Sequence, residues 1–201
     1  KAEYWYKKLE VITPDSLPVL HNLGIIYISL KKFTEAEKYL TREIILYGGS
    51  EIRYRVLGDL FYLSGEREKA VDSYKKALDL LGITDSNRSG ELFLRRRIRQ
   101  CREKSSYAKA MDGMKYYEEG VIQHSKGNFT KALELYNKAL ENDNSSFMSM
   151  NAAGTLLLNN LNDYKSAKNF FMKALELSDM PLIRSNLALA EHKLKERSNT
   201  I

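Results

Sequence analysis

Few side chains in this 201-residue chain have the type and spacing that catalysis requires. Its three histidines, His21, His124 and His192, are far apart in sequence, and no pair has the short spacing of metal ligands. Cys101 is the only cysteine, so neither an internal disulfide nor a thiol-rich metal site can form. The phosphate-binding motifs GxGxxG, GxxxxGKS and GxxxxGKT do not occur. The sequence therefore predicts no enzymatic activity, no metal site and no cofactor.

The surroundings of Cys101 indicate a packing role. It shares an apolar stripe with Leu94 and Ile98 on one predicted helix, which favours a buried small hydrophobe over a reactive thiol. A single cysteine suits a reducing compartment, so we predict a cytoplasmic protein, with a removed targeting segment left open. No run of 18 apolar residues predicts a membrane-spanning helix. The start at Lys1, without an initiator Met, indicates an excised fragment.

One segment carries most of the net charge. Residues 88–104 contain seven basic and two acidic side chains, which is +5 of the net +6. The candidate basic patch comprises Arg95, Arg96, Arg97, Arg99 and Arg102. Successive helical residues turn by about 100°, so these arginines cannot all face one side. We expect Arg96, Arg99 and Arg102 to point outward. A solvated face is the first interpretation, contact with an acidic protein the second, and nucleic acid or anionic lipid the third.

The elements that carry these residues recur at a fixed spacing. Intervals of 34 residues separate Gly24 from Gly58, Gly120 from Gly154, and Ala2, Ala36 and Ala70 from one another. Glycine inside a helix costs about 1 kcal/mol relative to alanine, so its recurrence indicates a repeated structural need. We interpret that need as the close approach of a second helix. We expect the aromatic residues Tyr74, Tyr136 and Phe171 to fill the groove to the next unit.

The repeat pattern is most complete in the second unit, at Gly58, Phe61, Gly65, Ala70, Tyr74 and Ala77. In these residues the chain resembles the tetratricopeptide repeat (TPR) family, whose 34-residue unit is a helix–turn–helix. Departures exist: Lys31 and Leu161 replace the usual glycine of the turn, and Glu43 replaces an alanine. The resemblance covers residues 1–83 and 113–197. It implies an all-α fold, a right-handed superhelical array of antiparallel helix pairs with a concave face lined by first helices.

The repeat is interrupted once. Along the sequence, Ala70 and Ala132 are separated by one full repeat unit plus 28 further residues. Because 28 residues are fewer than a full unit, one unit in this interval is degenerate. The pattern predicts a polar loop at 84–90, a helix at 90–104 and a long helix at 106–125. The predicted organisation is N-terminal units at 1–83 (the first one partial), a degenerate basic junction at 84–112, and C-terminal units with a terminal capping helix at 113–201. In the alternative, 106–112 is a short remnant helix and the array stays continuous, and we prefer a continuous array.

The resemblance also implies a binding surface. In this family, fixed positions of the first helices line a groove for peptides. Carried over, these positions hold His21, Ile25, Arg55, Asp59, Tyr62, Tyr117, Val121, His124, Asn151, Thr155 and Asn159. Apolar side chains suit anchoring and amides suit backbone groups. We therefore predict a non-catalytic scaffold that binds a protein or peptide partner, with no small-molecule substrate.

Three alternatives to a generic peptide groove were weighed. An assembly scaffold could contact RNA or anionic surfaces through the basic helix 91–104, although nucleic acid is the weaker choice of partner. Self-association could occur through the apolar edge of the incomplete first unit. The third is the carboxylate clamp of chaperone-binding TPR domains, which requires Lys and Asn at positions where this chain has His21 and Ile25, or Tyr117 and Val121. We therefore predict that the clamp is absent.

Overall fold

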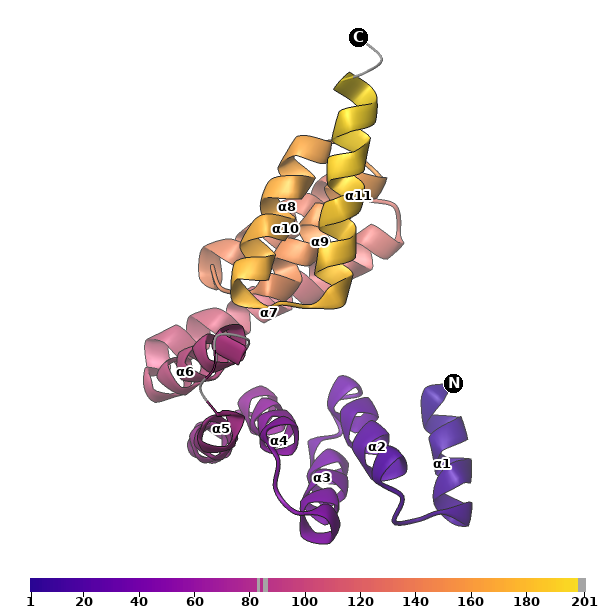
Figure 1. Ribbon diagram of the computed structural model, residues 1–201, viewed down its shortest axis with the longest axis vertical. Coiled ribbons are helices and arrows are strands. Elements are labelled where there is room, and N and C mark those ends of the chain that lie inside the picture. Colours follow the sequence, from indigo (N-terminus) through magenta and orange to yellow (C-terminus); the bar gives the residue numbers. More distant parts are fainter. Residues whose placement is uncertain (83, 85–86, 199–201) are drawn as a thin grey trace. The chain divides into compact units, whose positions relative to one another are not determined.

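The computed structural model describes residues 1–82, 84 and 87–198, and in these residues all regular structure is helical. Figure 1 labels the helices α1 to α11 in chain order. The predicted all-α fold class is confirmed. Contacts between Cα atoms divide the chain into two compact units, Lys1–Glu103 (unit 1) and Lys104–Ile201 (unit 2). Each unit is described by itself.

Unit 1 consists of helix pairs and two flanking helices. Its helices are α1 (Ala2–Ile12), α2 (Leu17–Ser29), α3 (Phe33–Tyr47), α4 (Glu51–Ser64), α5 (Arg67–Leu81) and α6 (Arg88–Arg102). Helices α2 and α3 form one pair, and α4 and α5 form the next. Helix α1 packs on α2, α6 packs on α5, and the first helices α2 and α4 also touch each other.

Unit 2 repeats this plan. Its helices are α7 (Lys104–Ser125), α8 (Phe129–Asn142), α9 (Phe147–Asn159), α10 (Tyr164–Leu177) and α11 (Pro181–Ser198). Helices α7 and α8 are paired, as are α9 and α10, and the last helix α11 lies against α10 (Figure 1). The first helix α9 touches both α7 and α11. Three first-helix surfaces therefore lie next to one another in this unit.

The recurring glycines mark the points of closest helix approach. A Cβ atom on Gly58 would lie 2.6 Å from the ring of Tyr74, and one on Gly120 would lie 2.6 Å from the ring of Tyr136. Gly154 has the same relation to Phe171 at 2.7 Å. The predicted close approach is confirmed. Tyr136 also shares a core cluster with Ala153 and Leu156 of α9, and Phe171 shares one with Ile183 and Ala190 of α11, so these two rings pack against the next helix pair or helix as expected.

The turns inside the pairs explain two departures from the repeat pattern. Gly65 ends α4 in the left-handed region, with φ of 90°. Lys31 occupies the same place after α2 and adopts φ of 57°, a conformation that costs an L-residue roughly 1–2 kcal/mol. In the α9–α10 turn of unit 2 the left-handed residue is Asn162, with φ of 54°, next to Leu161. The extra residue of this turn is thus accommodated by an asparagine, which tolerates this region well.

The helices of the interrupted repeat follow the predicted pattern. Helix α6 runs from Arg88 to Arg102, close to the predicted 90–104. Helix α7 is one uninterrupted helix from Lys104 to Ser125, which confirms the predicted long helix at 106–125, and the alternative of a short remnant helix at 106–112 is wrong. Residues 85 and 86 of the predicted loop 84–90 lie outside the described residues, and 88–90 are already helical. The two units meet between Glu103 and Lys104. The division into 1–83, 84–112 and 113–201 stays a proposal.

Helix length and hydropathy were also compared with what a lipid bilayer requires. Within the described ranges, no helix combines the length and apolar character that crossing a membrane demands.

Candidate functional site

The predicted binding residues of unit 1 lie on the first helices α2 and α4. Ile25 is 39% exposed, whereas His21, Arg55 and Asp59 are half-buried. Arg55 forms an ion pair of 3.6 Å with Glu51 one turn earlier. These four side chains are together called the unit 1 first-helix surface.

His21 is held in place by a buried carboxylate. Glu43 on α3 is 2% exposed, and its two carboxylate oxygens each lie 3.1 Å from Nδ1 of His21. Nε of Arg53 on α4 donates to the same carboxylate at 3.0 Å. Arg53 also donates to the backbone oxygens of Tyr47 and Gly48. The glutamate that departs from the repeat pattern therefore joins α2, α3 and α4.

Tyr62 does not belong to the surface. It is 1% exposed, and the guanidinium carbon of Arg97 lies 4.2 Å from the centre of its ring. Its hydroxyl donates to Oε1 of Gln100 at 3.4 Å, and Nη1 of Arg97 donates to the same oxygen at 3.2 Å. The prediction of Tyr62 as a peptide-contacting residue is wrong, because α6 covers it.

Asp59 is part of the same polar cluster. Its Oδ1 accepts a hydrogen bond of 2.6 Å from the hydroxyl of Tyr74 on α5. Burial raises the pKa of Asp59, and the positive charge of Arg97 opposes that shift. The carboxylate thus links α4 to α5, and Arg97 of α6 supplies a nearby positive charge.

The predicted residues of unit 2 lie on α7 and α9, and a third helix adds to them. Val121 is 43% exposed, Asn159 is exposed, and Tyr117, Asn151 and Thr155 are half-buried. These residues, with His124 and with Asn186 of α11, define the unit 2 first-helix surface.

Amide groups connect the three helices of this surface. Nε2 of His124 lies 3.1 Å from Oδ1 of Asn160, which links α7 to the end of α9. Nδ2 of Asn186 donates to Oδ1 of Asn151 at 3.1 Å and to Oγ1 of Thr155 at 3.5 Å. Sequence reasoning missed Asn160 and Asn186. The only signal for Asn186 in the sequence was its position about one repeat after Asn151. It lies on the helix that the sequence predicts to be the terminal cap.

The central helix of the unit 2 surface carries no charged side chain. No Asp, Glu, Lys or Arg occurs from Asn144 to Asn162, a stretch that contains all of α9, whereas α7 and α11 contain charged residues such as Lys115 and Arg184. Burial raises the pKa of Tyr117, and burial raises that of Tyr136 to about 12, so both phenols are uncharged at pH 7. In unit 1, the first helix α4 contains the ionisable residues Arg55 and Asp59.

The five arginines of the candidate basic patch do not all face solvent. Arg95 pairs with Glu91 at 2.7 Å, Arg96 is half-buried, and Arg97 lies over Tyr62 and Phe93. Arg99 and Arg102 are exposed. The inward positions follow the prediction: Leu94 is 0%, Ile98 8% and Cys101 1% exposed.

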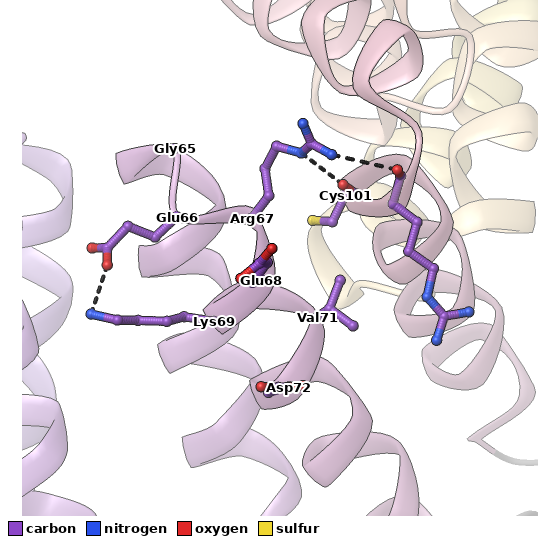
Figure 2. Close-up of a pocket in the computed structure, with 9 residues that line it drawn as sticks. Gly65, Glu66, Arg67, Glu68, Lys69, Val71, Asp72 and Cys101 are labelled. Atoms are coloured by element: carbon purple, nitrogen blue, oxygen red, sulfur yellow. Dashed lines mark hydrogen bonds and ion pairs between the residues drawn. The ribbon is translucent and has the colours of Figure 1, made fainter.

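A pocket of about 880 Å³ lies between the first half of α5 and the end of α6, and Figure 2 shows its lining. Nε of Arg67 reaches across to the backbone oxygen of Cys101 at 2.8 Å, and Nη2 reaches that of Arg102 at 3.4 Å. Arg67 therefore caps the last turn of α6. Burial raises the pKa of the Cys101 thiol to about 11, so it is protonated at neutral pH. This environment agrees with the prediction that Cys101 is buried and unreactive.

The pocket brings together side chains of both charges. Glu66 pairs with Lys69 at 2.6 Å, and Glu68 and Asp72 also line it. Across the described residues, no group of three or more His, Cys, Asp or Glu is placed to hold a metal ion. The first-helix surfaces are therefore better candidates for a binding site than this pocket.

Comparison with known proteins agrees with the helix pairs. Tetratricopeptide repeat models match residues 17–42, 54–88, 116–146 and 149–179, which together exceed half of the chain. The chain belongs to the tetratricopeptide repeat family. In the TPR units, the matched segments correspond to α2–α3, α4–α5, α7–α8 and α9–α10. Membership places the fold in the alpha-alpha superhelix class.

Similar TPR proteins include components of assemblies. The BBSome complex member BBS4 of Bos taurus is 34% identical over 74 residues, which is 37% of this chain and 14% of that protein. The photosystem I assembly protein Ycf3 of Synechococcus elongatus is 33% identical over 95 residues, covering 45% of this chain and 54% of Ycf3. The chain thus spans only part of the length of these relatives.

Solved structures of TPR proteins also align with most of the chain. YrrB, described as having an unusual peptide-binding site, aligns with a TM-score of 0.41 and 15% identity, over 96% of this chain and 81% of that chain. The TPR2AB domain of yeast Sti1 in complex with an HSP90 peptide also gives a TM-score of 0.41 and 15% identity, over 98% of this chain and 78% of that one.

Proposed function

We propose that this chain is a non-catalytic scaffold whose first-helix surfaces bind segments of partner proteins. The observation that carries the proposal is the set of exposed apolar and amide side chains on adjacent first helices. Ile25, Val121 and Asn159 are exposed there, while the core side chains of the same helices are covered. Apolar groups next to amide groups provide anchoring and orientation for a peptide.

Family membership supports a role in protein interaction. The curated relatives include a BBSome complex member and a photosystem I assembly protein, both named for multi-protein assemblies. A cytoplasmic location and self-association stay predictions. The exposed Trp5, Val11 and Ile12 of α1 are the apolar side chains that self-association would use.

A variant of both first-helix surfaces tests the proposal. Ile25→Asp adds a negative charge to the unit 1 surface, and Val121→Asp with Asn159→Asp adds two to the unit 2 surface, at exposed positions where folding tolerates a polar side chain. Proteins captured from cells by the tagged wild-type chain are identified by quantitative mass spectrometry. We expect the recovery of specific partners to fall about tenfold or more with this variant, since a buried unpaired charge is costly at an interface.

A second-helix variant provides the matched control. Thr41→Asp, Asn137→Asp and Asn169→Asp make the same change in net charge at exposed positions of α3, α8 and α10. Partner recovery with this control should equal that of the wild type, and far-ultraviolet circular dichroism should show equal helicity for all three proteins. Equal recovery with both variants would refute a role for the first-helix surfaces.

The exposed Arg99 and Arg102 support a second candidate function, contact with RNA or an anionic surface through α6. Within the candidate basic patch, Arg95 already pairs with Glu91, and Arg97 donates a hydrogen bond to Gln100. Binding to RNA or to anionic vesicles should fall steeply between low and physiological salt, and Arg99→Ala with Arg102→Ala should reduce the slope. Binding that is insensitive to salt would eliminate this candidate.

A further inference from the structure

We propose that the pocket between α5 and α6 binds a helix of a partner protein, one with basic side chains in its first turns, and that this helix completes the interrupted repeat. The pocket lies outside both first-helix surfaces, so this contact is distinct from the proposed function. Its mixed charge does not suit a metal ion or an apolar anchor, but it suits the ion pairs of a helix–helix contact. Three observations support the proposal: the place of the pocket in the repeat, the links between complete units and the unpaired charges on α5.

The interrupted repeat leaves α6 without a second helix in unit 1. The first helices α2 and α4 are each followed, after a short turn, by a second helix that packs on them. Among the described residues of unit 1 no helix follows α6, because the unit ends at Glu103, and the next helix pairs with α8 in unit 2. The pocket of about 880 Å³ lies beside the end of α6, where a second helix would begin (Figure 2). A helix with side chains is about 10–12 Å wide and rises 5.4 Å per turn, so this volume corresponds to roughly two turns.

An ion pair at a fixed position of the repeat joins successive second helices. Nζ of Lys32, the N-cap residue of α3, lies 3.5 Å from Oε1 of Glu3 on α1. Nζ of Lys69, in the first turn of α5, lies 3.6 Å from Oε1 of Glu37 on α3. Glu3 and Glu37 are 34 residues apart, and the next residue in this series is Val71, which lines the pocket. The pocket therefore lies where the repeat places the contact between α5 and a further second helix.

Two carboxylates beside Val71 have no partner. Glu68 and Asp72 line the pocket, are exposed, and form no side-chain hydrogen bond or ion pair with the described residues. Residues three and four apart are neighbours on a helix, so both carboxylates share one face of α5 with Val71, as Figure 2 shows. The exposed Arg102 of α6 also lines the pocket, and no ion pair joins its side chain to a described residue. The site thus presents two negative charges on one wall and one positive charge on the other.

These charges define the partner helix. Its first turns carry Lys or Arg residues three or four positions apart for Glu68 and Asp72, with an apolar side chain between them for Val71. An acidic side chain on its other side faces Arg102. Exposed ion pairs add little affinity, so the charges select the partner and its orientation, while apolar contact supplies the binding free energy. A helix fits this place because it has already paired its own backbone groups and needs only side-chain contacts.

A display library of short peptides, held helical by a staple on the outer face and selected against the full chain, tests this inference. We expect enrichment of peptides with Lys or Arg three or four residues apart in the first turns. Binding of the best peptide, measured by fluorescence anisotropy, should weaken when salt is raised, because the charges of the pocket are exposed to solvent. Enrichment of acidic residues at these positions would overturn the inference, as would a selection without enrichment.

Variants of α5 locate the bound peptide. Glu68→Lys with Asp72→Lys should weaken binding about tenfold or more, because attraction becomes repulsion. Glu35→Lys with Asp79→Lys makes the same change in net charge at exposed positions outside the pocket and should leave the affinity unchanged. Equal loss with both variants would contradict a site in the pocket.

A charge exchange separates recognition from a folding defect. A form of the best peptide with Glu in place of its basic pair should bind the Glu68→Lys, Asp72→Lys variant more tightly than it binds the wild type. An unfolded variant cannot produce this recovery. Failure of the exchanged peptide to recover binding, with circular dichroism showing a folded variant, would overturn the assigned ion pairs.

Two further outcomes distinguish this inference from its alternatives. The variant Ile25→Asp, Val121→Asp, Asn159→Asp should bind the peptide as the wild type does. Loss of binding there would place the peptide on the first-helix surfaces, so this inference would fail while the scaffold function stands. If sedimentation shows a dimer that Glu68→Lys with Asp72→Lys separates, the occupant is a second copy of the chain and the assignment to a partner protein is overturned.

Discussion

Gly58→Ala is predicted to destabilise unit 1, although alanine is the better helix former. Gly58 lies in the interior of α4, and a Cβ atom there would be 2.6 Å from both Cδ1 and Cε1 of Tyr74. The ring cannot easily move away. It is 0% exposed, and its hydroxyl donates to Asp59 at 2.6 Å, so it is fixed at both ends.

The expected size follows from two opposing effects. Replacing glycine by alanine inside a helix stabilises by about 1 kcal/mol. Inserting a methyl group into a packed contact costs about 1–3 kcal/mol, and this contact is tighter than atoms tolerate. The net loss should be about 1 kcal/mol, which corresponds to a fall in melting temperature of roughly 4–8 °C for a unit of this size.

Gly90→Ala is the matched control, because the same substitution there has room. Gly90 lies in the first turn of α6, and a Cβ atom would be 3.6 Å from Cδ2 of Leu81, an ordinary contact. We expect stabilisation by about 0.5–1 kcal/mol. Urea unfolding followed by circular dichroism measures both variants, and hydrogen exchange of α4 and α5 peptides reports the local effect. If Gly58→Ala proves as stabilising as Gly90→Ala, the close-approach account of the repeat is refuted.

Three further perturbations follow from particular contacts. Lys31→Gly should stabilise by about 0.5 kcal/mol in urea unfolding, because glycine adopts the φ of 57° found there without strain; a loss of stability would contradict this. Glu43→Gln should destabilise by about 2 kcal/mol, since Glu43 is 2% exposed and accepts from His21 and Arg53; an unchanged urea midpoint would refute the joining role of this carboxylate. Burial raises the pKa of the Cys101 thiol from 9.0 to about 11, so the folded chain keeps a proton that the unfolded chain releases. The stability that this thiol contributes is fully present below pH 9, and the free energy of unfolding should fall by about 2 kcal/mol as pH rises through 11. If a Cys101→Ala variant shows the same pH slope, the thiol is excluded as its cause.

The helix pairs could be predicted from sequence because their packing is local and repeated. Gly58 and Tyr74 recur as Gly120 with Tyr136 in unit 2, and the 34-residue period makes such contacts visible without any coordinates. The positions of the first-helix residues followed from the same period.

Contacts of the irregular helices could not be predicted in this way. Tyr62 has the sequence position of a surface residue, but α6 packs over it and places Arg97 on its ring. The inward positions Leu94, Ile98 and Cys101 of α6 could be predicted from their spacing, but α6 does not follow the repeat, so the residues of α4 that it covers could not. Asn186 was missed for a similar reason: its amide joins the surface only because α11 packs beside α9. The long helix α7 could be predicted because no strong break in the sequence separates 106–112 from the residues that follow.

The most direct test of the scaffold function compares partner recovery by two variants of equal charge. One carries Asp at Ile25, Val121 and Asn159, and the other carries Asp at the three exposed second-helix positions. The first-helix surfaces are expected to account for binding, so recovery should fall about tenfold with the first variant and stay at the wild-type level with the second. Equal recovery by the two folded variants would contradict the account.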